Sequence, residues 1–557
     1  PAAAVRAALD AARAAVLGLP DDGHLVVVTR GATGDEGPQA PGPAPSGGPG
    51  DLSGLIGAAL WGFVRAAVQE FPGKVGVVDL DDSPESTAGL PRALAARPGQ
   101  IALRRGEVVR PRLRALTGAP GDAPDLGSGT VMVTGAGGAL GGEVVRHLAR
   151  RHGARRLLLV SRRGDADPAL RALAGELAAQ DGVDVRTAAC DVADPAATEA
   201  LVAGVAGDLV AVVHAAGALD DAVLENTTPE RLDRVLRPKV DAAWNLHRLT
   251  AHLPLRAFVL FSSVAGVLGN AGQAGYAAAN AFLDALARHR RAAGLPALSL
   301  AWGLWDSGGG MAAELSAAAR ARLDRMGVRP LVSGEALDLL DHALAAGPAV
   351  LVPARFDRAA LARRQGEPPE VLADLAPAAA APAVRAVPLA RRLDGLDEEA
   401  ARALVRGVVA GRVAEVLGLP GGARVPEDRG LFDLGLDSLT AIELRNRLGE
   451  ESGERLPATV LFDHPTVREL TAYLLDRVRG ERPVFDPAAL DAWVSAASGR
   501  TGGDRQRAEL VRALRGALSV LDPAGGRPAA NGGDSLAGVE AASDDELFGL
   551  LDRELSE

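Results

Sequence analysis

From residue 129 onward the chain repeats one pattern, in which a short apolar strand is followed by a turn, a helix and another apolar strand. This alternation predicts a doubly wound α/β domain, because neighbouring parallel strands need a crossover connection and that connection is usually a helix. Ligands of such domains bind at the carboxyl ends of the strands, so we expect the functional site at that edge. The apolar strands read VMVTG, RLLLVSRRG, VDVRTAACD, LVAVVHAAG, AFVLFSS and ALSLAWG.

Changes in pattern divide the 557 residues into several domains. The length itself predicts about three or four of them. The chain begins with Pro1 rather than Met, so we expect it to be a piece of a longer protein whose first subdomain is truncated. We expect a structural subdomain at 1–118, a doubly wound subdomain at 119–364, a Pro- and Ala-rich linker at 365–395, a compact helical domain at 396–480 and a helical tail at 481–557.

The first 118 residues predict a small α/β unit without a Gly-rich phosphate-binding turn. Residues 24–31 and 74–81 are typical of strands, and residues 101–109 are typical of a hairpin. Between the two strands, the segment LIGAALWGFVRAAVQEF predicts a helix. Because no motif in this region carries chemistry, we assign it a structural role.

Composition argues against several classes of function. The formal net charge of -11 argues against nucleic-acid binding, and no stretch of 18 uncharged apolar residues predicts a membrane span. The single cysteine, Cys190, can form neither an intrachain disulfide nor a cysteine-based zinc site, which suits a reducing compartment. We therefore expect a cytoplasmic protein that contacts neither nucleic acid nor membrane and carries no metal.

A Gly-rich turn follows the first strand of the repeated pattern and opens the helix GEVVRHLARR. Glycines there allow backbone N–H groups to approach a pyrophosphate at the positive end of the helix. The next strand ends in SRRG, where an NAD site would carry an acidic residue, so its arginines favour the 2′-phosphate of NADPH. A tight packing turn and solvated surface arginines are the alternatives. The expected cofactor contacts are Thr134, Gly135, Gly137, Gly138 and Leu140 in the turn, and Ser161 and Arg162 after the second strand.

Lysine and tyrosine are rare, because the whole chain contains only two lysines and two tyrosines. Lys239 is one of the lysines, and Tyr276 is one of the tyrosines. Tyr276 and Asn280 share one face of an expected helix, and Ser263 ends an expected strand. A phenol can protonate a developing alkoxide when an ammonium stabilises its phenolate form and a hydroxyl shares the oxyanion. These residues supply such groups, and a buried tyrosine with a hydrogen-bonded hydroxyl is the alternative.

Together these motifs resemble the ketoreductase domain of modular type I polyketide synthases, a complex short-chain dehydrogenase/reductase with a Rossmann-like fold. The match spans nearly all of residues 1–364 and includes TGAGGALG, LLLVSRRG, CDVAD, VVHAAG, FSSVAG, GQAGYAAAN and SLAWGLW. The resemblance implies NADPH-dependent reduction in which Tyr276 is the general acid, Ser263 orients the β-carbonyl and Lys239 tunes the phenol. Asn280 completes the site. Further implied cofactor contacts are Asp191, Val192, His214, Ala215, Ala216 and Gly217.

The resemblance also bears on stereochemistry. Leu219-Asp220-Asp221 resembles the LDD signature of B-type ketoreductases, and Leu268 stands where A-type members carry Trp. Ala278 stands where epimerising B-type domains carry Pro. This implies a B1-type reduction to a D-configured, usually 3R, β-hydroxyacyl product without epimerisation; taken alone, the two aspartates indicate only a loop or a helix start. Residues 306–320 contain three consecutive glycines and suit a lid over the site.

Residues 396–480 contain FDLGLDSL followed by LPATVLFDHPT and resemble an acyl carrier protein, an all-α four-helix fold. Asp437 can cap the next helix and leave Ser438 exposed at its N-terminus. The resemblance implies a 4′-phosphopantetheine arm that a phosphopantetheinyl transferase attaches to Ser438. Outside this context a DSL tripeptide is mostly a helix cap.

The tail at 481–557 contains two amphipathic stretches and ends in an acidic segment at 543–555 with a capping-box pattern. By its similarity to the C-terminal docking regions of polyketide synthase modules, we expect a homodimer and a downstream synthase polypeptide as partner. Ketosynthase and acyltransferase domains are expected upstream. A frayed tail is the alternative for this segment, and a reductively inactive scaffold with carrier and docking functions is the alternative for the chain.

Overall fold

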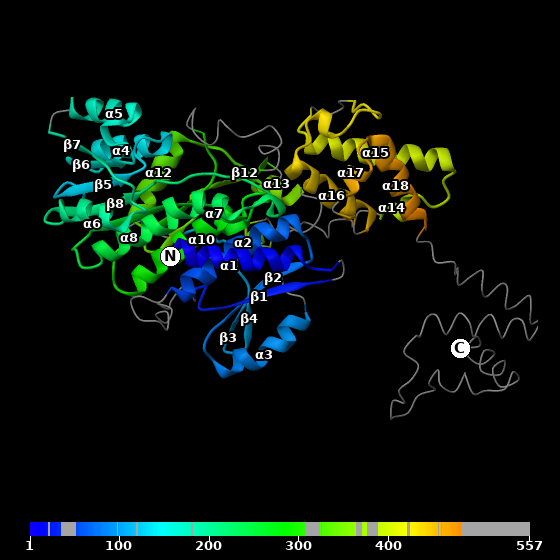
Figure 1. The fold of residues 1–557 in the computed structure, drawn as a ribbon, viewed down its shortest axis with the longest axis horizontal. Coiled ribbons are helices and arrows are strands. Elements are labelled where there is room, and N and C mark those ends of the chain that lie inside the picture. Colours follow the sequence, from blue (N-terminus) through cyan, green and yellow to red (C-terminus); the bar gives the residue numbers. More distant parts are fainter. Residues whose placement is uncertain are drawn as a thin grey trace, which may run out of the picture. The chain divides into compact units, whose positions relative to one another are not determined.

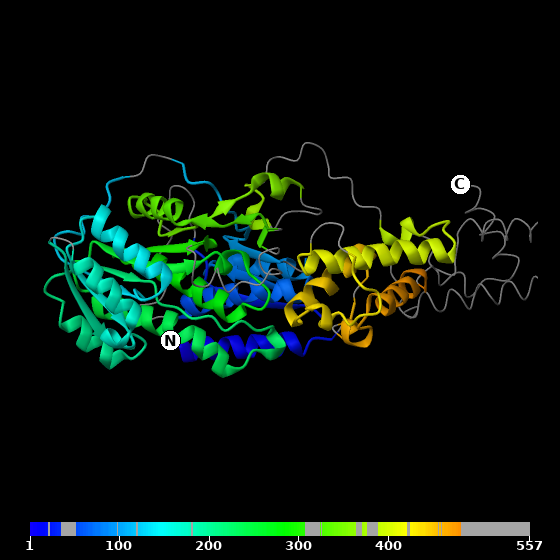
Figure 2. The same ribbon diagram turned by 90° about the horizontal axis from the view of Figure 1, so that it is seen from above.

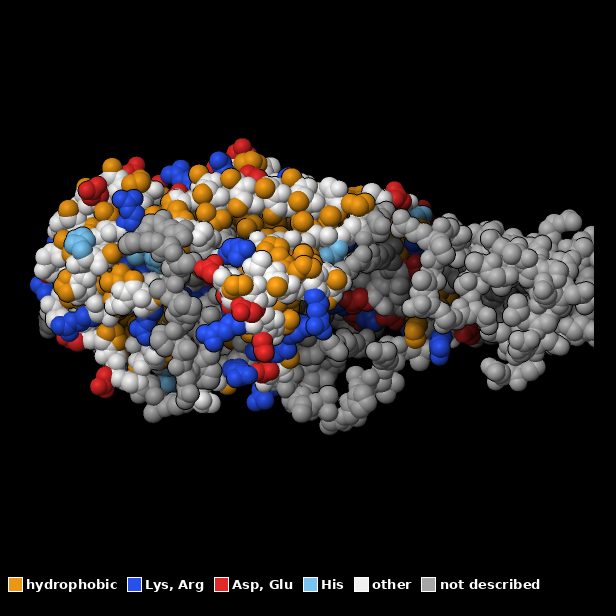
Figure 3. Space-filling model, turned by 90° about the horizontal axis from the view of Figure 1, so that it is seen from below, with side chains coloured by type: hydrophobic (Ala, Val, Ile, Leu, Met, Phe, Trp, Pro, Cys, Tyr) orange, Lys and Arg blue, Asp and Glu red, His pale blue; other side chains and the backbone are white. Residues whose placement is uncertain are grey.

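A computed structural model describes most of the chain up to residue 480. The predicted tail and docking helices at 481–557 lie outside the described residues, as does the predicted lid after Asp306. In the described part, no helix combines the length and the apolar character needed to cross a bilayer. Basic and acidic side chains are interspersed on the face drawn in Figure 3. Within 1–480, the residues not described are 21–22, 35–51, 97–98, 118–120, 180–181, 307–322, 325, 364–369, 376–387, 420–423, 455 and 458.

The first subdomain contains a four-stranded sheet in the order β1-β2-β3-β4. Its first three strands are parallel, and β4 pairs antiparallel with β3 across a turn at Arg105-Gly106, where both residues have positive φ. The strands, helix and hairpin predicted for this region are confirmed. The bounds are α1 (Ala2–Leu17), β1 (Leu25–Arg30), α2 (Ser53–Glu70), β2 (Val75–Leu80), α3 (Pro84–Ala95), β3 (Gln100–Arg104) and β4 (Glu107–Val109).

Seven parallel strands form the second sheet, in the order β14-β10-β9-β8-β5-β6-β7 (Figure 1). The chain runs outward from β5 through β6 to β7 and then continues on the other side of β5 with β8, so a crevice forms where the direction reverses. All six predicted strands are present, which confirms the doubly wound fold. The bounds are β5 (Thr130–Thr134), β6 (Arg156–Ser161), β7 (Asp184–Ala189), β8 (Leu209–His214), β9 (Ala257–Ser263), β10 (Leu298–Trp302) and β14 (Val350–Leu351).

Helices cover both faces of this sheet (Figures 1 and 2). Successive strand residues point to opposite faces, so Val131 and Val133 pack in one apolar core and Met132 packs in another. The first core includes α4 (Ala139–Arg151), α5 (Pro168–Ala178) and α12 (Ser333–Leu344). The second includes α6 (Pro195–Ala203), α7 (Pro229–Leu236), η3 (Arg237–Asp241), α8 (Ala242–Thr250) and α10 (Ala274–Ala292).

Short elements complete the doubly wound subdomain near the carboxyl ends of its strands. They are η1 (Gly164–Ala166), η2 (Leu224–Asn226), α9 (Ala265–Leu268), β11 (Trp305–Asp306), β12 (Val328–Arg329), β13 (Leu331–Val332), β15 (Arg355–Phe356) and α13 (Arg358–Arg363). β11 pairs with β13, and β12 pairs with β15.

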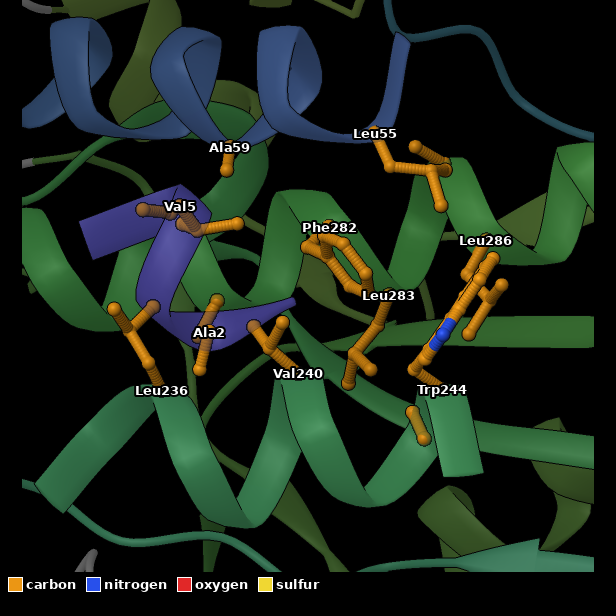
Figure 4. Packing of buried hydrophobic residues seen from close by; sticks show 14 of the residues in the cluster. Ala2, Val5, Leu55, Ala59, Leu236, Val240, Trp244, Phe282, Leu283 and Leu286 are labelled. Carbon is orange, nitrogen blue, oxygen red and sulfur yellow. The ribbon is translucent and has the colours of Figure 1, made fainter. Parts of the chain in front are cut away.

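The two α/β subdomains share one apolar core, in which α1 and α2 pack against α10 and α7 (Figure 4). Figure 4 shows Val5 and Ala59 from the first subdomain close to Phe282 of α10. The two helices α2 and α10 approach so closely that a Cβ added at Gly62 would lie 2.3 Å from the carbonyl oxygen of Ala277. The first subdomain therefore supports α10, the helix that carries Tyr276, as expected for a structural role.

The third part of the chain is a small all-α domain, as predicted. Valines of α15 and leucines of α16 and α18, such as Val409, Leu444 and Leu470, form its buried core. The bounds are α14 (Leu389–Arg392), α15 (Glu398–Val416), η6 (Phe432–Leu434), α16 (Ser438–Ser452), α17 (Val460–Asp463) and α18 (Val467–Gly480).

The segment at 365–395 differs from the semi-extended linker expected from its composition. Residues 370–372 form the short helix η5 (Glu370–Leu372), whose Leu372 is fully buried beside Val328 and Leu361. Arg112 donates a hydrogen bond to the carbonyl oxygen of Glu370 at 2.9 Å. Residues 370–372 thus pack on the doubly wound subdomain, because the apolar side chain of Leu372 has buried partners that composition does not reveal.

Candidate functional site

A cavity of about 1190 Å³ opens at the carboxyl ends of β5, β6, β8 and β9. This is the point where the strand order reverses, and its volume suits a dinucleotide together with part of a substrate. Most of the residues selected from the sequence line it. These are Thr134, Gly135, Gly137, Gly138, Leu140, Ser161, Arg162, Asp191, Val192, Ala215, Ala216, Gly217, Leu219, Lys239, Ser263 and Tyr276.

Two positions have room only for glycine, Gly135 in the turn between β5 and α4 and Gly141 in the first turn of α4. Gly135 has a φ of 74°, and a Cβ there would lie 2.7 Å from the backbone nitrogen of Ala216. At Gly141, a Cβ would lie 2.2 Å from the carbonyl oxygen of Gly135. α4 begins without a side-chain cap, so the N–H groups of its first turn are available to an anion. This geometry is what a pyrophosphate requires.

The two arginines after β6 differ in what they contact. Arg163 forms an ion pair with Asp167 at 3.0 Å. Arg162 is exposed beside the cavity and has no ion pair with any residue that the structure describes. Arg162 is therefore the better placed of the two to bind a 2′-phosphate, because its charge is not already neutralised.

His214, expected among the cofactor contacts, lies behind the cavity wall. It is fully buried, and its Nδ1 is 2.7 Å from the Thr134 hydroxyl oxygen. Burial lowers the pKa of His214 to about 3, so the imidazole is neutral. His214 thus does not line the cavity itself, and its contact with the site runs through Thr134, which does line it. Sequence position at the end of β8 does not reveal which way the ring points.

Lys239 reaches the site from the helical turn η3. It is buried, and its Nζ donates a hydrogen bond to the carbonyl oxygen of Phe261 at 2.8 Å. The same nitrogen lies 5.6 Å from the centroid of the Tyr276 ring. Burial lowers the pKa of the Lys239 ammonium to about 8. A Cβ at Gly217 would lie 2.9 Å from the Lys239 Cε, so the glycine leaves room for the lysine side chain.

Tyr276 and Ser263 meet at the same wall of the cavity. Tyr276 is 9% exposed, and burial raises the pKa of its phenol, while hydrogen bonding to Ser263 and Asn280 opposes the rise. Ser263 ends β9, and its hydroxyl oxygen accepts a hydrogen bond from the Ala265 N–H. The structure therefore brings together the phenol, the hydroxyl and the ammonium selected from the sequence.

Asn280 lies one turn after Tyr276 and is buried behind it rather than at the cavity surface. Its Nδ2 donates to the Tyr276 carbonyl oxygen at 2.8 Å. Its Oδ1 is buried without a hydrogen-bond partner among the described residues. A buried acceptor without a partner next to Tyr276 could accept a hydrogen bond from a water molecule, which is more than a packing role requires.

The two aspartates after Leu219 do not line the cavity, although Leu219 does. Asp220 forms ion pairs with Arg231 at 2.7 Å and Arg234 at 3.0 Å on α7. Asp221 accepts a hydrogen bond from Gln273 Nε2 at 2.8 Å. They therefore fix the segment that carries Leu219 between α7 and the start of α10.

Several cavity residues escaped the sequence analysis. Gln273 lines the cavity from the position just before α10, three residues ahead of Tyr276. Trp302 and Trp305, with ring centroids 4.7 Å apart, form another wall. They belong to the motif SLAWGLW, to which we had assigned no role.

In the helical domain, Ser438 is the first residue of α16 and is exposed. Asp437 caps the helix as predicted: its carboxylate accepts the Thr440 N–H at 2.8 Å, and the Thr440 hydroxyl oxygen accepts the Asp437 N–H at 2.8 Å. Such a reciprocal cap holds the serine hydroxyl at the positive end of the helix, where a phosphodiester is stabilised.

Three family models match the chain. Residues 129–307 match a model described as the KR domain, and residues 1–113 match the Rossmann fold domain of the polyketide synthase extender module SpnB. Residues 408–474 match the phosphopantetheine attachment site. The first two matches cover the two α/β subdomains, and the third covers most of the helical domain.

Curated relatives align with almost the whole chain. The spectinabilin polyketide synthase system protein NorA' of Streptomyces orinoci is 44% identical over 570 residues, which are 96% of this chain and 15% of that protein. Polyketide synthase GfsA of Streptomyces halstedii is 42% identical over 556 residues, 96% of this chain and 7% of that protein. The chain thus spans a small fraction of the length of these relatives.

Solved ketoreductases resemble it as well. A structure described as an A1-type ketoreductase has a TM-score of 0.55 and 39% identity, covering 63% of this chain and 73% of that one. PlmKR1, from the first module of phoslactomycin biosynthesis in Streptomyces sp. HK803, has a TM-score of 0.58 and 35% identity, covering 68% and 86%. A C2-type ketoreductase has a TM-score of 0.55 and 34% identity, covering 63% and 72%. The types differ, so the stereochemical subtype of this chain depends on its own residues.

Proposed function

This chain belongs to the ketoreductases of modular type I polyketide synthases, and we propose that it reduces a β-ketoacyl thioester held on its own carrier. The carrier is the phosphopantetheine-attachment domain that follows the reductase in the sequence. The observation that carries the proposal is the convergence of Tyr276, Ser263 and Lys239 at one wall of the cavity. The product is a β-hydroxyacyl thioester for polyketide biosynthesis.

The residues that would hold NADPH fit it. The turn at Gly135 and the uncapped start of α4 would bind the pyrophosphate, and Arg162 would bind the 2′-phosphate. NADPH, when bound, supplies the hydride for the reduction. A Cβ at Gly135 or Gly141 would collide with the protein backbone, so glycine lets the turn pack closely while Gly137 and Gly138 line the cavity where the cofactor would bind.

The chain supplies the proton and stabilises the charge on oxygen. The Tyr276 hydroxyl donates its proton to the substrate oxygen as the carbonyl carbon accepts the hydride, so the products balance as an alcohol. The Ser263 hydroxyl donates a hydrogen bond to the same oxygen. The Lys239 ammonium donates one of its three N–H groups to the Phe261 carbonyl oxygen. The other two N–H groups can stabilise the phenolate of Tyr276 and return a proton to it.

Replacing Tyr276 by Phe tests this assignment. The variant keeps the ring but loses the proton donor, so reduction of a β-ketoacyl thioester surrogate should fall roughly 10²- to 10⁴-fold. Tyr473→Phe is the matched control, because the only other tyrosine stacks on His464 in the helical domain. Equal rates for the parent and the Tyr276 variant would sink the proposal.

For stereochemistry, we propose B1-type reduction to a D-configured, 3R alcohol without α-epimerisation. The support is the Leu219-Asp220-Asp221 segment, with Leu219 at the cavity, and Leu268 rather than Trp in the cavity wall. Chiral analysis of the alcohol made from a diketide thioester and NADPH is the test. An L-configured alcohol would overturn this part while leaving the reductase assignment intact.

The carrier function rests on Ser438. We expect a phosphopantetheinyl transferase with coenzyme A to add one arm, visible by intact-mass spectrometry, and Ser438→Ala to gain none. Addition of an arm to the alanine variant, or none to the parent, contradicts the assignment. Upstream ketosynthase and acyltransferase domains, a downstream polypeptide and a homodimer are the partners that we propose with this role.

A further inference from the structure

Two histidines and one aspartate converge on the side of the doubly wound subdomain away from the cavity. His147 lies on α4, His152 ends that helix and Asp341 lies on α12. The Nε2 atoms of His147 and His152 are 2.5 Å and 2.6 Å from the same oxygen, Asp341 Oδ1. One donor atom from each residue lies within 4.8 Å of the other two, and none of the three residues lines the cavity.

The end of α4 explains how the histidines meet. They are five residues apart, which on a continuing helix would place them about 140° apart around the axis. α4 instead stops at Arg151, and Gly153 takes a φ of 65°. The chain turns, and the two imidazole rings end with centroids 5.5 Å apart at an angle of 61°. Neither the spacing nor the distant Asp341 could have indicated this cluster from the sequence.

We propose that His147, His152 and Asp341 form a binding site for a divalent transition metal, with Zn²⁺ as the best fit. Two imidazole nitrogens and one carboxylate oxygen are a common zinc ligand set, and zinc accepts water as the fourth ligand. Asp341 is 23% exposed, so water can reach the site. The expectation of no metal rested on the lone cysteine and took no account of nitrogen and oxygen donors.

The geometry needs only side-chain adjustment to hold the ion. Bonds of about 2.0 to 2.1 Å in a tetrahedral site separate the donor atoms by about 3.3 Å. Each Nε2 must therefore move away from Asp341 Oδ1 by about 0.7 to 0.8 Å, which small side-chain rotations supply. The histidines are 15% and 8% exposed, so the protein already holds both near the required place.

One neighbouring charge opposes the metal. Arg151 Nε lies 3.7 Å from Asp341 Oδ2, and the arginine side chain is 74% exposed. A cation in the site would be repelled by this guanidinium, which lowers the affinity but leaves the ligands in place. Removing the arginine charge should therefore strengthen metal binding, whereas it would do little for a purely structural cluster of hydrogen bonds.

A bound ion would tie α12 to α4. The N-terminus of α4 borders the nucleotide cavity, and α12 directly follows β13, the partner of β11 with Trp305 of the cavity wall. A metal ion at this site would therefore stabilise the relative positions of α4 and α12, which lie next to the cavity. This role is independent of the reductase assignment, because it depends on neither Tyr276 nor a bound nucleotide.

Calorimetric titration of the metal-free chain with zinc chloride tests the proposal. We expect one saturable site per chain, a higher melting temperature with zinc, and about a tenfold or larger rise in Kd for His147→Gln and for Asp341→Asn. His342→Gln is the matched control, because this exposed neighbour contacts the Asp338 carbonyl oxygen rather than the cluster and should leave Kd unchanged. Substitution with Co²⁺ should give the visible absorption of a tetrahedral site.

Arg151→Gln provides a second test, which does not depend on the folding of the His147 and Asp341 variants. This exposed substitution should lower the Kd for zinc. Absence of saturable binding by the parent, or equal Kd values for the parent, His147→Gln and Asp341→Asn, would overturn the proposal. An unchanged or raised Kd in Arg151→Gln would also contradict it, because the predicted repulsion would then be absent.

Discussion

A buried carboxylate in the structural subdomain should give the reductase a measurable pH dependence of stability. Glu70, the last residue of α2, is 1% exposed. Its two oxygens accept the N–H groups of Leu224 and Gly272, each at 2.8 Å. Leu224 follows the segment of Leu219, and Gly272 precedes α10. One side chain therefore links the segment after Leu219 to the segment before α10.

Burial raises the pKa of Glu70 from 4.5 to about 7, although the two backbone hydrogen bonds oppose the rise. Between pH 4.5 and pH 7 the folded chain binds one proton more than the unfolded chain. The stabilisation that protonated Glu70 contributes to the folded state is therefore fully present below pH 4.5 and is lost as pH rises through 7. From pH 5 to pH 8, the linkage equation gives a loss of about 2.5 kcal/mol.

Glu70→Gln removes this proton linkage while keeping the shape of the side chain. The amide can accept only one of the two N–H groups, so at pH 5 the variant should be less stable by roughly 1 to 3 kcal/mol. The difference in unfolding free energy between the parent and the variant should then shrink by about 2.5 kcal/mol from pH 5 to pH 8. The parent loses stability over this range because its Glu70 becomes a buried charge, whereas the glutamine stays neutral.

Urea unfolding of the reductase transition, measured at pH 5, 6, 7 and 8, is the assay. Glu199→Gln, at an exposed position, is the control and should follow the parent at every pH. Parallel curves of unfolding free energy against pH for the parent and Glu70→Gln would refute the reasoning, because they would show that Glu70 carries no extra proton in the folded state.

Four further outcomes follow from the site. Lys239→Arg should lose reduction by roughly 10²-fold or more, because the planar guanidinium does not fit beside Gly217, whereas Lys74→Arg should keep the parent rate. Gly217→Ala should lower kcat through the 2.9 Å approach of its Cβ to Lys239, while Gly207→Ala, which meets no atom within 4 Å, should not. Arg162→Ala should raise KM for NADPH about tenfold and leave KM for NADH unchanged, and Arg163→Ala, already paired with Asp167, should change neither. In the parent, kcat should fall as pH rises through about 8, because the Lys239 ammonium loses its proton there, as a pH–rate profile can check.

The doubly wound sheet and the nucleotide turn were predictable because their signals are local. Apolar strands with helices between them leave few topologies, and the positive φ of Gly135 demands glycine wherever such a turn occurs. Tyr276 and Asn280 were predictable as a pair because four residues make about one helical turn. In each case the deciding contact lies within a few residues along the chain.

Contacts between distant residues account for what the sequence did not reveal. Asp220 turns to α7 because Arg231 and Arg234 lie there, and His214 turns to Thr134 on a neighbouring strand. Asp341 is 189 residues from His152. The orientation of such side chains depends on partners that are distant in the sequence, so local periodicity does not predict it.

Position 239 is one of two where the chain carries lysine rather than arginine, and the packing around it bears on that choice. Arginine serves in 58 of its 60 basic positions. At position 239 the cation must be buried, donate to the Phe261 carbonyl oxygen and lie within reach of the Tyr276 phenol. Arginine keeps its proton throughout the physiological range and presents a wider planar group. An ammonium whose pKa is about 8 can both hold a charge beside the phenolate and exchange a proton with it. Under the proposed function, this favours lysine over arginine at position 239, because the reaction would need a compact cation that can titrate.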